Sequence, residues 1–217
     1  LQQAYAQAER GEAMALGARS TPFSVWSLRQ HAYGMQAERL AELGWWQQRL
    51  TDVVAWPAAE TASTDTATNT ATNAPTATHT IRLDPQTTSA LLYDGAHGAG
   101  RPGLTPEVLL LAALTRTLAQ RSAQPRVLVE LEGHGREDIF DDIDLTRTVG
   151  WFTTRYPVVL EADDDATHTL HAVRTALGEV PQRGLHWGLL QARVSQDATV
   201  REALAGLPQA TVGFNYL

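Results

Sequence analysis

The feature that most constrains this chain is a stretch of low-complexity sequence at residues 58–78. It consists almost entirely of Thr, Ala, Asn, Ser and Pro. Such a segment buries too little apolar surface to offset the conformational entropy that it would lose on ordering. We therefore expect a flexible insertion or linker there, and we divide the chain into residues 1–57, 58–78 and 79–217.

The parts on either side of this stretch carry clear helix and strand signals. Apolar residues recur at helical spacing over residues 1–17 and 23–50, and residues 80–83 alternate as in a short strand. Asp84 and Thr105 each precede a proline, which is the arrangement of an N-cap followed by the first helical residue. The second of these helices is apolar all round at residues 108–114, which predicts that it is buried.

Two strands follow, at residues 126–132 and 156–160. The first places Val127, Val129 and Leu131 on one face and Glu130 and Glu132 on the other. We expect a helix over residues 167–177 and a last strand over residues 210–217. This alternation of helices and strands predicts an α/β or α+β fold with a mixed sheet.

Composition excludes several functional classes. The 217 residues carry a formal net charge of −7 and no cysteine, so a nucleic-acid footprint, disulfides and thiolate chemistry are not expected. No apolar run approaches the ~20 residues of a membrane helix. We expect a cytoplasmic protein without nucleic-acid or membrane partners. Both ends, which begin at Leu1 and finish on an apolar run, read as cuts, so we interpret the chain as a fragment.

The segment 130–137 is the best candidate for chemistry. The strand predicted over residues 126–132 ends at Glu132. The loop after it contains His134 between two glycines, and then Arg136. A carboxylate, an imidazole and a guanidinium that converge at a strand end would suit proton transfer beside a developing negative charge. The simpler interpretation is an ion pair between Glu132 and Arg136 that closes a turn, and spacing alone leaves both open.

A second unusual segment spans residues 147–157, where Gly150 precedes the aromatic pair Trp151 and Phe152. The pair either lines a tunnel or fills a core, and composition leaves both open. A metal site is not expected, because His168 and His171 share a helical face behind three aspartates but have no third organised ligand.

These segments resemble the signature motifs of nonribosomal peptide synthetase epimerization domains. The matching segments are residues 132–137 (Glu-Gly-His-Gly-Arg-Glu), 147–157, and 214–217 (Phe-Asn-Tyr-Leu), in the order of the family. Residues 21–26 (Thr-Pro-Phe-Ser-Val-Trp) also resemble an upstream Thr-Ser-Phe-x-x-Trp stretch of those domains. The resemblance covers most of the chain outside the low-complexity stretch.

The resemblance implies a fold, an activity and partners. The family has a two-lobed fold like that of chloramphenicol acetyltransferase, so this chain would hold the helical end of the first lobe (1–57) and most of the second lobe (79–217). The implied activity is the conversion of an L-aminoacyl or peptidyl thioester to the D form. The substrate would be carried on the phosphopantetheine arm of an upstream peptidyl carrier protein, beside other domains of the same synthetase. No cofactor of the domain's own is implied.

Carried over by position, Glu132 is the catalytic glutamate of the family. Arg136, Asn215 and Tyr216 fall on motif positions that support the site, as do His134 and Trp151. Such a base must be desolvated or held in alignment, because the α-proton of a thioester is only weakly acidic.

The chain departs from the family pattern in two places. The family's His-His-x-x-x-Asp-Gly motif, whose second histidine returns the proton on the opposite face, is absent, and we expect the fragment alone to be inactive. Residues 181–188 keep only part of the family's Pro-x-x-Gly-x-Gly-Tyr-Gly, which puts the local backbone geometry in question. The histidines are His31, His79, His97, His134, His168, His171 and His186.

Two other interpretations stay open. A condensation domain, which forms peptide bonds, typically carries Ile-Gly-x-Phe-Val-Asn-Thr where this chain has Val-Gly-Trp-Phe-Thr at residues 149–153. A non-catalytic relative would only dock other synthetase domains or recruit proteins, and the presence of Glu132 argues against that role.

Overall fold

The computed structural model describes residues 2–56, 77–95, 104–193 and 196–216. The predicted linker at 58–78 therefore lies almost wholly outside the described residues, and the division of the chain there stays a prediction. None of the helices within the described ranges is both long and apolar enough to cross a membrane.

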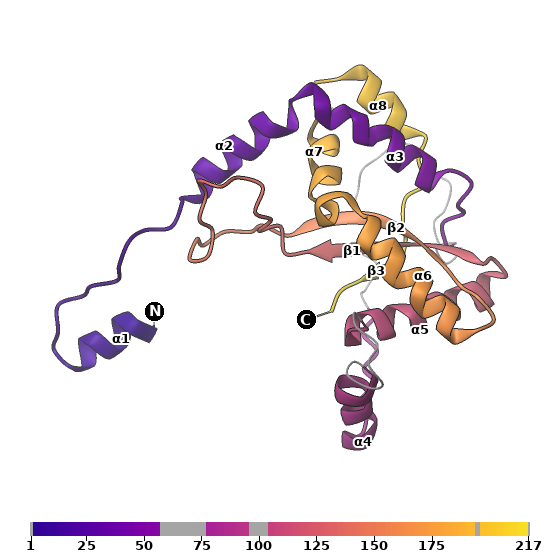
Figure 1. The fold of residues 1–217 in the computed structure, drawn as a ribbon, viewed down its shortest axis with the longest axis horizontal. Coiled ribbons are helices and arrows are strands. Elements are labelled where there is room, and N and C mark those ends of the chain that lie inside the picture. The colour runs from indigo at the N-terminus through magenta and orange to yellow at the C-terminus, as the bar shows by residue number, and fades with distance from the viewer. Residues whose placement is uncertain (1, 57–76, 96–103, 194–195, 217) are drawn as a thin grey trace.

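A mixed three-stranded sheet forms the centre of the molecule (Figure 1). β1 (Arg126–Gly133) pairs antiparallel with β2 (Thr154–Glu161) and parallel with the short β3 (Gly213–Phe214), so the strand order is β2-β1-β3. The predicted mixed sheet is confirmed. The first half of β1 is buried on both faces, since Leu128 and Val129 are each at most 1% exposed.

Helices cover both faces of this sheet. α5 (Pro106–Ser122) and α6 (Ala166–Glu179) lie on the side of Val129 and Tyr156, whereas α7 (Leu185–Arg193) and α8 (Ala198–Ala205) lie on the side of Glu130 (Figure 1). α3 (Ala41–Leu50) joins the second group, because the ring of its Trp46 lies 4.9 Å from that of Trp187. A helix from the first part of the chain thus shares one core with the helices near its end.

A second, smaller core lies beside α2 (Phe23–Gly34). Trp26 of this helix packs with Leu145 and Phe152, which belong to the long loop between β1 and β2. The rings of Phe23 and Phe152 meet edge to face with centroids 5.1 Å apart. The aromatic pair at residues 151–152 was expected either to line a tunnel or to fill a core, and Phe152 fills a core.

The predicted helix starts are confirmed at α4 (Pro85–Ser89) and α5. The side chain of Asp84 accepts a hydrogen bond from the backbone N–H of Thr87, and that of Thr105 accepts one from Val108. α4 continues into the π-helical turn η2 (Ala90–Gly95). The predicted burial of α5 holds for one face only, since Val108, Leu111 and Leu118 are buried.

The helix predicted over residues 1–17 is wrong beyond Glu9. α1 spans Gln2–Glu9, and Gly11 then takes a left-handed φ of +65°. The side chain of Gln7 exchanges two hydrogen bonds of 3.1 Å with the backbone of Ala15, so the following segment folds back along the helix.

The helix predicted over residues 23–50 is interrupted. α2 ends at Gly34, and the 3₁₀ turn η1 (Ala37–Leu40) separates it from α3. Arg193 donates to the carbonyls of Gly34 and Gln36 at 2.8 and 3.0 Å, which satisfies acceptors freed by the break.

Two predicted strands also differ from the structure. Residues 80–83 form no strand, and Ile81 and Leu83 are exposed. The strand expected over 210–217 shortens to the two residues of β3. In each case an apolar alternation was present, but a strand requires a neighbouring strand to bond with.

Candidate functional site

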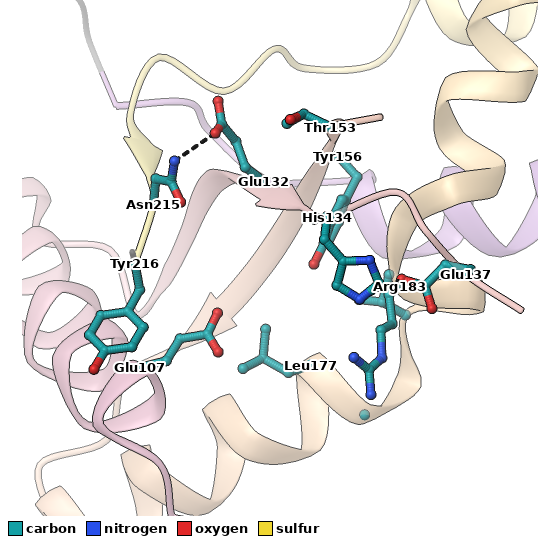
Figure 2. A pocket seen from close by; sticks show the side chains of 13 residues that line it. Glu107, Glu132, His134, Glu137, Thr153, Tyr156, Leu177, Arg183, Asn215 and Tyr216 are labelled. Atoms are coloured by element: carbon teal, nitrogen blue, oxygen red, sulfur yellow. Dashed lines mark hydrogen bonds and ion pairs between the residues drawn. The ribbon is translucent and has the colours of Figure 1, made fainter. Parts of the chain in front are cut away.

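An open cavity of about 730 Å³ lies where β1 ends and β2 begins (Figure 2). Its volume is within the usual range of small-molecule sites. The walls come from the ends of both strands, the first turn of α5, the end of α6 and the segment after β3. The lining residues are Glu107, Glu132, Gly133, His134, Glu137, Thr153, Tyr156, Leu177, Gly178, Val180, Arg183, Asn215 and Tyr216.

Glu132, the predicted base, stands at the end of β1 and is exposed to this cavity. The side-chain amide of Asn215 donates a 2.7 Å hydrogen bond to its Oε2 (Figure 2). The parallel pairing of β3 with β1 produces this contact, because Leu131 is in register with Phe214 and the two polar residues follow side by side. The bond fixes one carboxylate oxygen in position, whereas Oε1 has no partner among the residues that the structure describes.

His134 closes the turn after β1. Its Nδ1 accepts a 2.9 Å hydrogen bond from the backbone N–H of Arg136, and its Nε2 lies 3.4 Å from Oε1 of Glu137. A ring whose Nδ1 accepts carries its proton on Nε2 when it is neutral. Both ring nitrogens are therefore committed to the turn, although the imidazole lines the cavity wall.

Arg136 is directed away from Glu132. Its guanidinium donates to the carbonyls of Leu145 and Thr148 at 2.5 and 2.9 Å, and its central carbon lies 3.9 Å from the centre of the Phe152 ring. The predicted convergence thus brings together Glu132 and His134 at the cavity, while Arg136 clamps the loop between β1 and β2. This clamp also replaces the ion pair with Glu132 that sequence left open.

The two glycines around His134 have separate roles. A Cβ at Gly133 would lie 2.7 Å from Oγ1 of Thr154, so the strands approach too closely for a side chain there. Gly135 has a φ of +67°, and a Cβ at this position would lie 1.6 Å from the carbonyl oxygen of Phe152. Only glycine fits both the conformation and the space.

The remaining predicted residues lie at different places. Tyr216 lines the cavity on the side of Glu107 (Figure 2) and is 43% exposed. Trp151 is outside the cavity lining and 83% exposed, whereas the adjacent Phe152 is buried. His168 lies 3.5 Å from Asp163, and no cluster with the make-up of a metal site occurs among the described residues.

Several cavity residues escaped the sequence analysis, and Tyr156 is the best buried of those that carry a polar group. Burial raises the pKa of its phenol from 10.0 to about 12, and the negative charges of Glu107 and Glu137 add to that effect. Arg183 sits in a backbone segment with positive φ at three successive residues, 182–184. The sequence analysis placed Tyr156 and Glu137 inside segments that resemble family motifs, Glu107 at a helix start and Arg183 in an altered motif, but it gave none of them a role in the site.

The cavity has a negative wall. Three carboxylates, those of Glu107, Glu132 and Glu137, face one guanidinium among the lining residues, that of Arg183. Such a site favours neutral or cationic ligands over anionic ones. It combines a positioned carboxylate with a neutral phenol, which is an arrangement that can accept a proton and donate a hydrogen bond.

Comparisons with known proteins agree with this architecture. A linear gramicidin synthase of Brevibacillus parabrevis is 35% identical over 221 residues, which include 100% of this chain and 4% of the relative. The epimerization domain from the third module of tyrocidine synthetase B superposes with a TM-score of 0.78 at 28% identity, over 99% of this chain and 48% of that one. The chain thus spans a small part of that synthase and less than half of that solved structure.

A more distant solved structure shares the fold alone. The first condensation domain of the calcium-dependent antibiotic synthetase, in complex with a substrate analogue, has a TM-score of 0.63 at 15% identity, over 98% of this chain and 42% of that one. The family model described as the condensation domain matches residues 1–217, which is the whole sequence. With its mixed sheet, its cavity at the end of β1 and this match over its full length, the chain belongs to the condensation-domain family.

Proposed function

We propose that this chain is part of an epimerization domain of a nonribosomal peptide synthetase. Its substrate is an L-aminoacyl or peptidyl thioester on the phosphopantetheine arm of a carrier protein, and its product is the D form. The carrier protein and other synthetase domains are the proposed partners, in keeping with a similar synthase of which this chain matches only 4%.

One observation carries this proposal. Glu132 and Asn215 belong to two motifs that resemble those of epimerization domains, and they meet at 2.7 Å on the cavity wall although they lie 83 residues apart in sequence. A carboxylate held by an amide beside an open cavity is suited to proton abstraction, since the base is fixed in position and has one free oxygen.

The proposed chemistry is a proton transfer at one carbon atom. Glu132 accepts the α-proton, and the electron pair of the C–H bond moves toward the thioester carbonyl to form an enolate. A second acid returns a proton to the opposite face of the same carbon, so the configuration inverts without oxidation or reduction. We assign that acid to a part of the domain outside residues 1–217.

Peptide-bond formation is the alternative that this family offers. The greater similarity to the epimerization domain, in both TM-score and identity, supports epimerization over condensation. The run at residues 132–137 supports it as well, because it resembles a signature motif of epimerization domains.

The test is isotope exchange on a loaded carrier protein. The gene that encodes these residues would be expressed at full length, its carrier loaded with an L-aminoacyl group, and the reaction run in deuterated water. We expect deuterium at the α-carbon together with D product, both abolished by Glu132→Gln. Glu161→Gln is the matched control, because Glu161 is exposed at the opposite end of the same strand pair.

Two results would contradict the proposal. A folded wild-type protein that shows no exchange but joins two loaded carriers through a peptide bond is a condensation domain. A protein that does neither, yet binds its neighbouring domains, is a docking relative.

A further inference from the structure

Tyr156 stands in a slot formed by two glycines. A Cβ at Gly184 would lie 1.9 Å from a carbon atom of the Tyr156 ring, and a Cβ at Gly133 would lie 3.6 Å from another. Gly184 ends the run of three residues with positive φ in η4 (Pro181–Gly184). Residues other than glycine adopt this conformation only at an energetic cost, and such strain concentrates at functional sites. The strained segment here shapes a wall that fits the phenol ring.

The hydroxyl at the end of this ring faces the cavity. The side chain enters from β2 and reaches into the cavity next to His134 (Figure 2), and the residue as a whole is 8% exposed. Within the described part of the chain, no other group forms a hydrogen bond with this hydroxyl. The raised pKa keeps the phenol protonated throughout the physiological pH range.

The other polar groups of the cavity are less suited to donate a hydrogen bond. Glu107, Glu132 and Glu137 accept when they are ionised, and the amide of Asn215 already donates to Glu132. Thr153 and Arg183 are exposed, so water competes for their donors. Tyr156 is a buried, neutral donor fixed by its slot, and such preorganised donors stabilise developing negative charge effectively.

We propose that Tyr156 contacts the substrate, and that its hydroxyl donates a hydrogen bond to the carbonyl oxygen of the bound thioester. The bond strengthens as the α-proton leaves and negative charge moves onto that oxygen. The phenol keeps its own proton, so the step needs no further reactant. This inference rests on the proposed function, since it assigns to the cavity the carbonyl of an acyl thioester.

The first test compares exchange rates of Tyr156→Phe and Tyr93→Phe, where Tyr93 is an exposed tyrosine outside the cavity lining. Removal of one such donor typically lowers a rate by about 10²- to 10³-fold. We expect this loss in deuterium exchange for Tyr156→Phe and none for Tyr93→Phe. Fluorotyrosine at position 156 keeps the ring and its donor, and is expected to restore exchange relative to phenylalanine.

The second test does not depend on turnover. A pantetheine amide of an amino acid, labelled with ¹³C at the acyl carbonyl, would be bound to each protein and observed by NMR. A carbonyl shift to higher frequency with wild type that is lost with Tyr156→Phe supports the contact. An unchanged shift, or wild-type exchange by Tyr156→Phe, overturns it. A wild-type protein that shows the shift but no exchange would retain the contact and refute epimerization.

Discussion

The loop between β1 and β2 and the cavity beside it differ in how fully their polar groups are paired. In the loop, Arg136 is bound to two carbonyls and a ring, and Oγ1 of Thr148 donates to the carbonyl of Thr21 at 2.6 Å. In the cavity, Glu132 has one hydrogen-bond partner and the hydroxyl of Tyr156 has none among the described residues. Arg136 in the loop comes only four positions after Glu132 in the cavity.

This difference shows that the motif at residues 132–137 contains residues with two separate roles, one in the stability of the loop and one in the cavity. Arg136 and Gly135 hold the two ends of the loop together at Phe152, which packs against Phe23 of α2, and these contacts hold the end of β1 in place. Glu132 remains available because its neighbours supply the stability. Loss of the loop contacts should therefore unfold the region, whereas loss of the cavity groups should leave the fold and remove activity.

The largest effect is expected for Gly135→Ala. A left-handed φ combined with a Cβ 1.6 Å from the oxygen of Phe152 forces the backbone to move. We expect the free energy of unfolding to fall by about 3–5 kcal/mol, measured by urea denaturation. Gly44→Ala is the control, because Gly44 lies in α3 with open space around it and should gain up to about 1 kcal/mol. Equal stabilities would show that the loop does not anchor this strand.

Arg136→Ala should have the next largest effect. It removes two charge-assisted hydrogen bonds and leaves the carbonyls of Leu145 and Thr148 without their donor. We expect a loss of about 2–3 kcal/mol in the same measurement. Arg147→Ala, which removes one exposed 3.3 Å bond to Ala18, should cost less than about 1 kcal/mol. If the two variants were equally stable, the hydrogen bonds of Arg136 would contribute no more to stability than one exposed bond.

Alkaline titration tests the burial of Tyr156. Its folded pKa of about 12 exceeds the ordinary 10.0, so between these values the unfolded chain loses a proton that the folded chain keeps. The stabilisation is complete below pH 10, and as the pH rises toward 12 the free energy of unfolding should fall by about 2–3 kcal/mol. Tyr156→Phe should lack this part of the decline, and Tyr5→Phe, at an exposed site, should retain it. Parallel curves for all three would contradict the assignment.

Asn215→Ala should separate stability from activity. The bond to Glu132 is exposed, so its loss should cost at most about 1 kcal/mol. Because the carboxylate then loses its alignment, we expect the exchange rate to fall about 10- to 100-fold. A variant that is as active as wild type would mean that Glu132 needs no positioning.

Trp151→Ser should have the smallest effect on stability. At 83% exposure its side chain makes little contact with the rest of the described chain, so the change should stay within about 0.5 kcal/mol. Phe152→Ser, one residue later in the small core, should cost several times more. A large loss for Trp151→Ser would place that ring in a contact that this structure does not contain.

Much of the fold followed from local sequence. β1, β2, α6 and the caps of α4 and α5 were predictable because their patterns coincide with buried faces or with hydrogen bonds a few residues away. The helix predicted over residues 1–17 and the strand predicted over 210–217 were too long, and two larger failures were the long helix predicted over residues 23–50 and the strand predicted over 80–83. Both depend on partners distant in sequence, such as Arg193 at the end of α2.

The candidate site was predicted only in part for the same reason. Resemblance pointed to Glu132, Asn215 and Tyr216, and all three line the cavity. The orientation of Arg136 depends on the carbonyls of a loop whose path has no sequence signature. Tyr156 lies in the motif-like segment 147–157, but no role was predicted for it, because its slot is created by the unusual backbone near Gly184, far along the chain.

The shortness of β3 has a consequence for the timing of activity. Only two residues of β3 pair with β1, against eight positions paired between β1 and β2, so the edge that brings Asn215 to Glu132 should open more readily than the rest of the sheet, although Val212 and Phe214 also pack against the core. A ribosome would also complete the rest of the sheet well before it releases this strand. The hydrogen bond that aligns Glu132 therefore forms only after this strand has been made, and fraying at this edge would remove that alignment without unfolding β1 and β2.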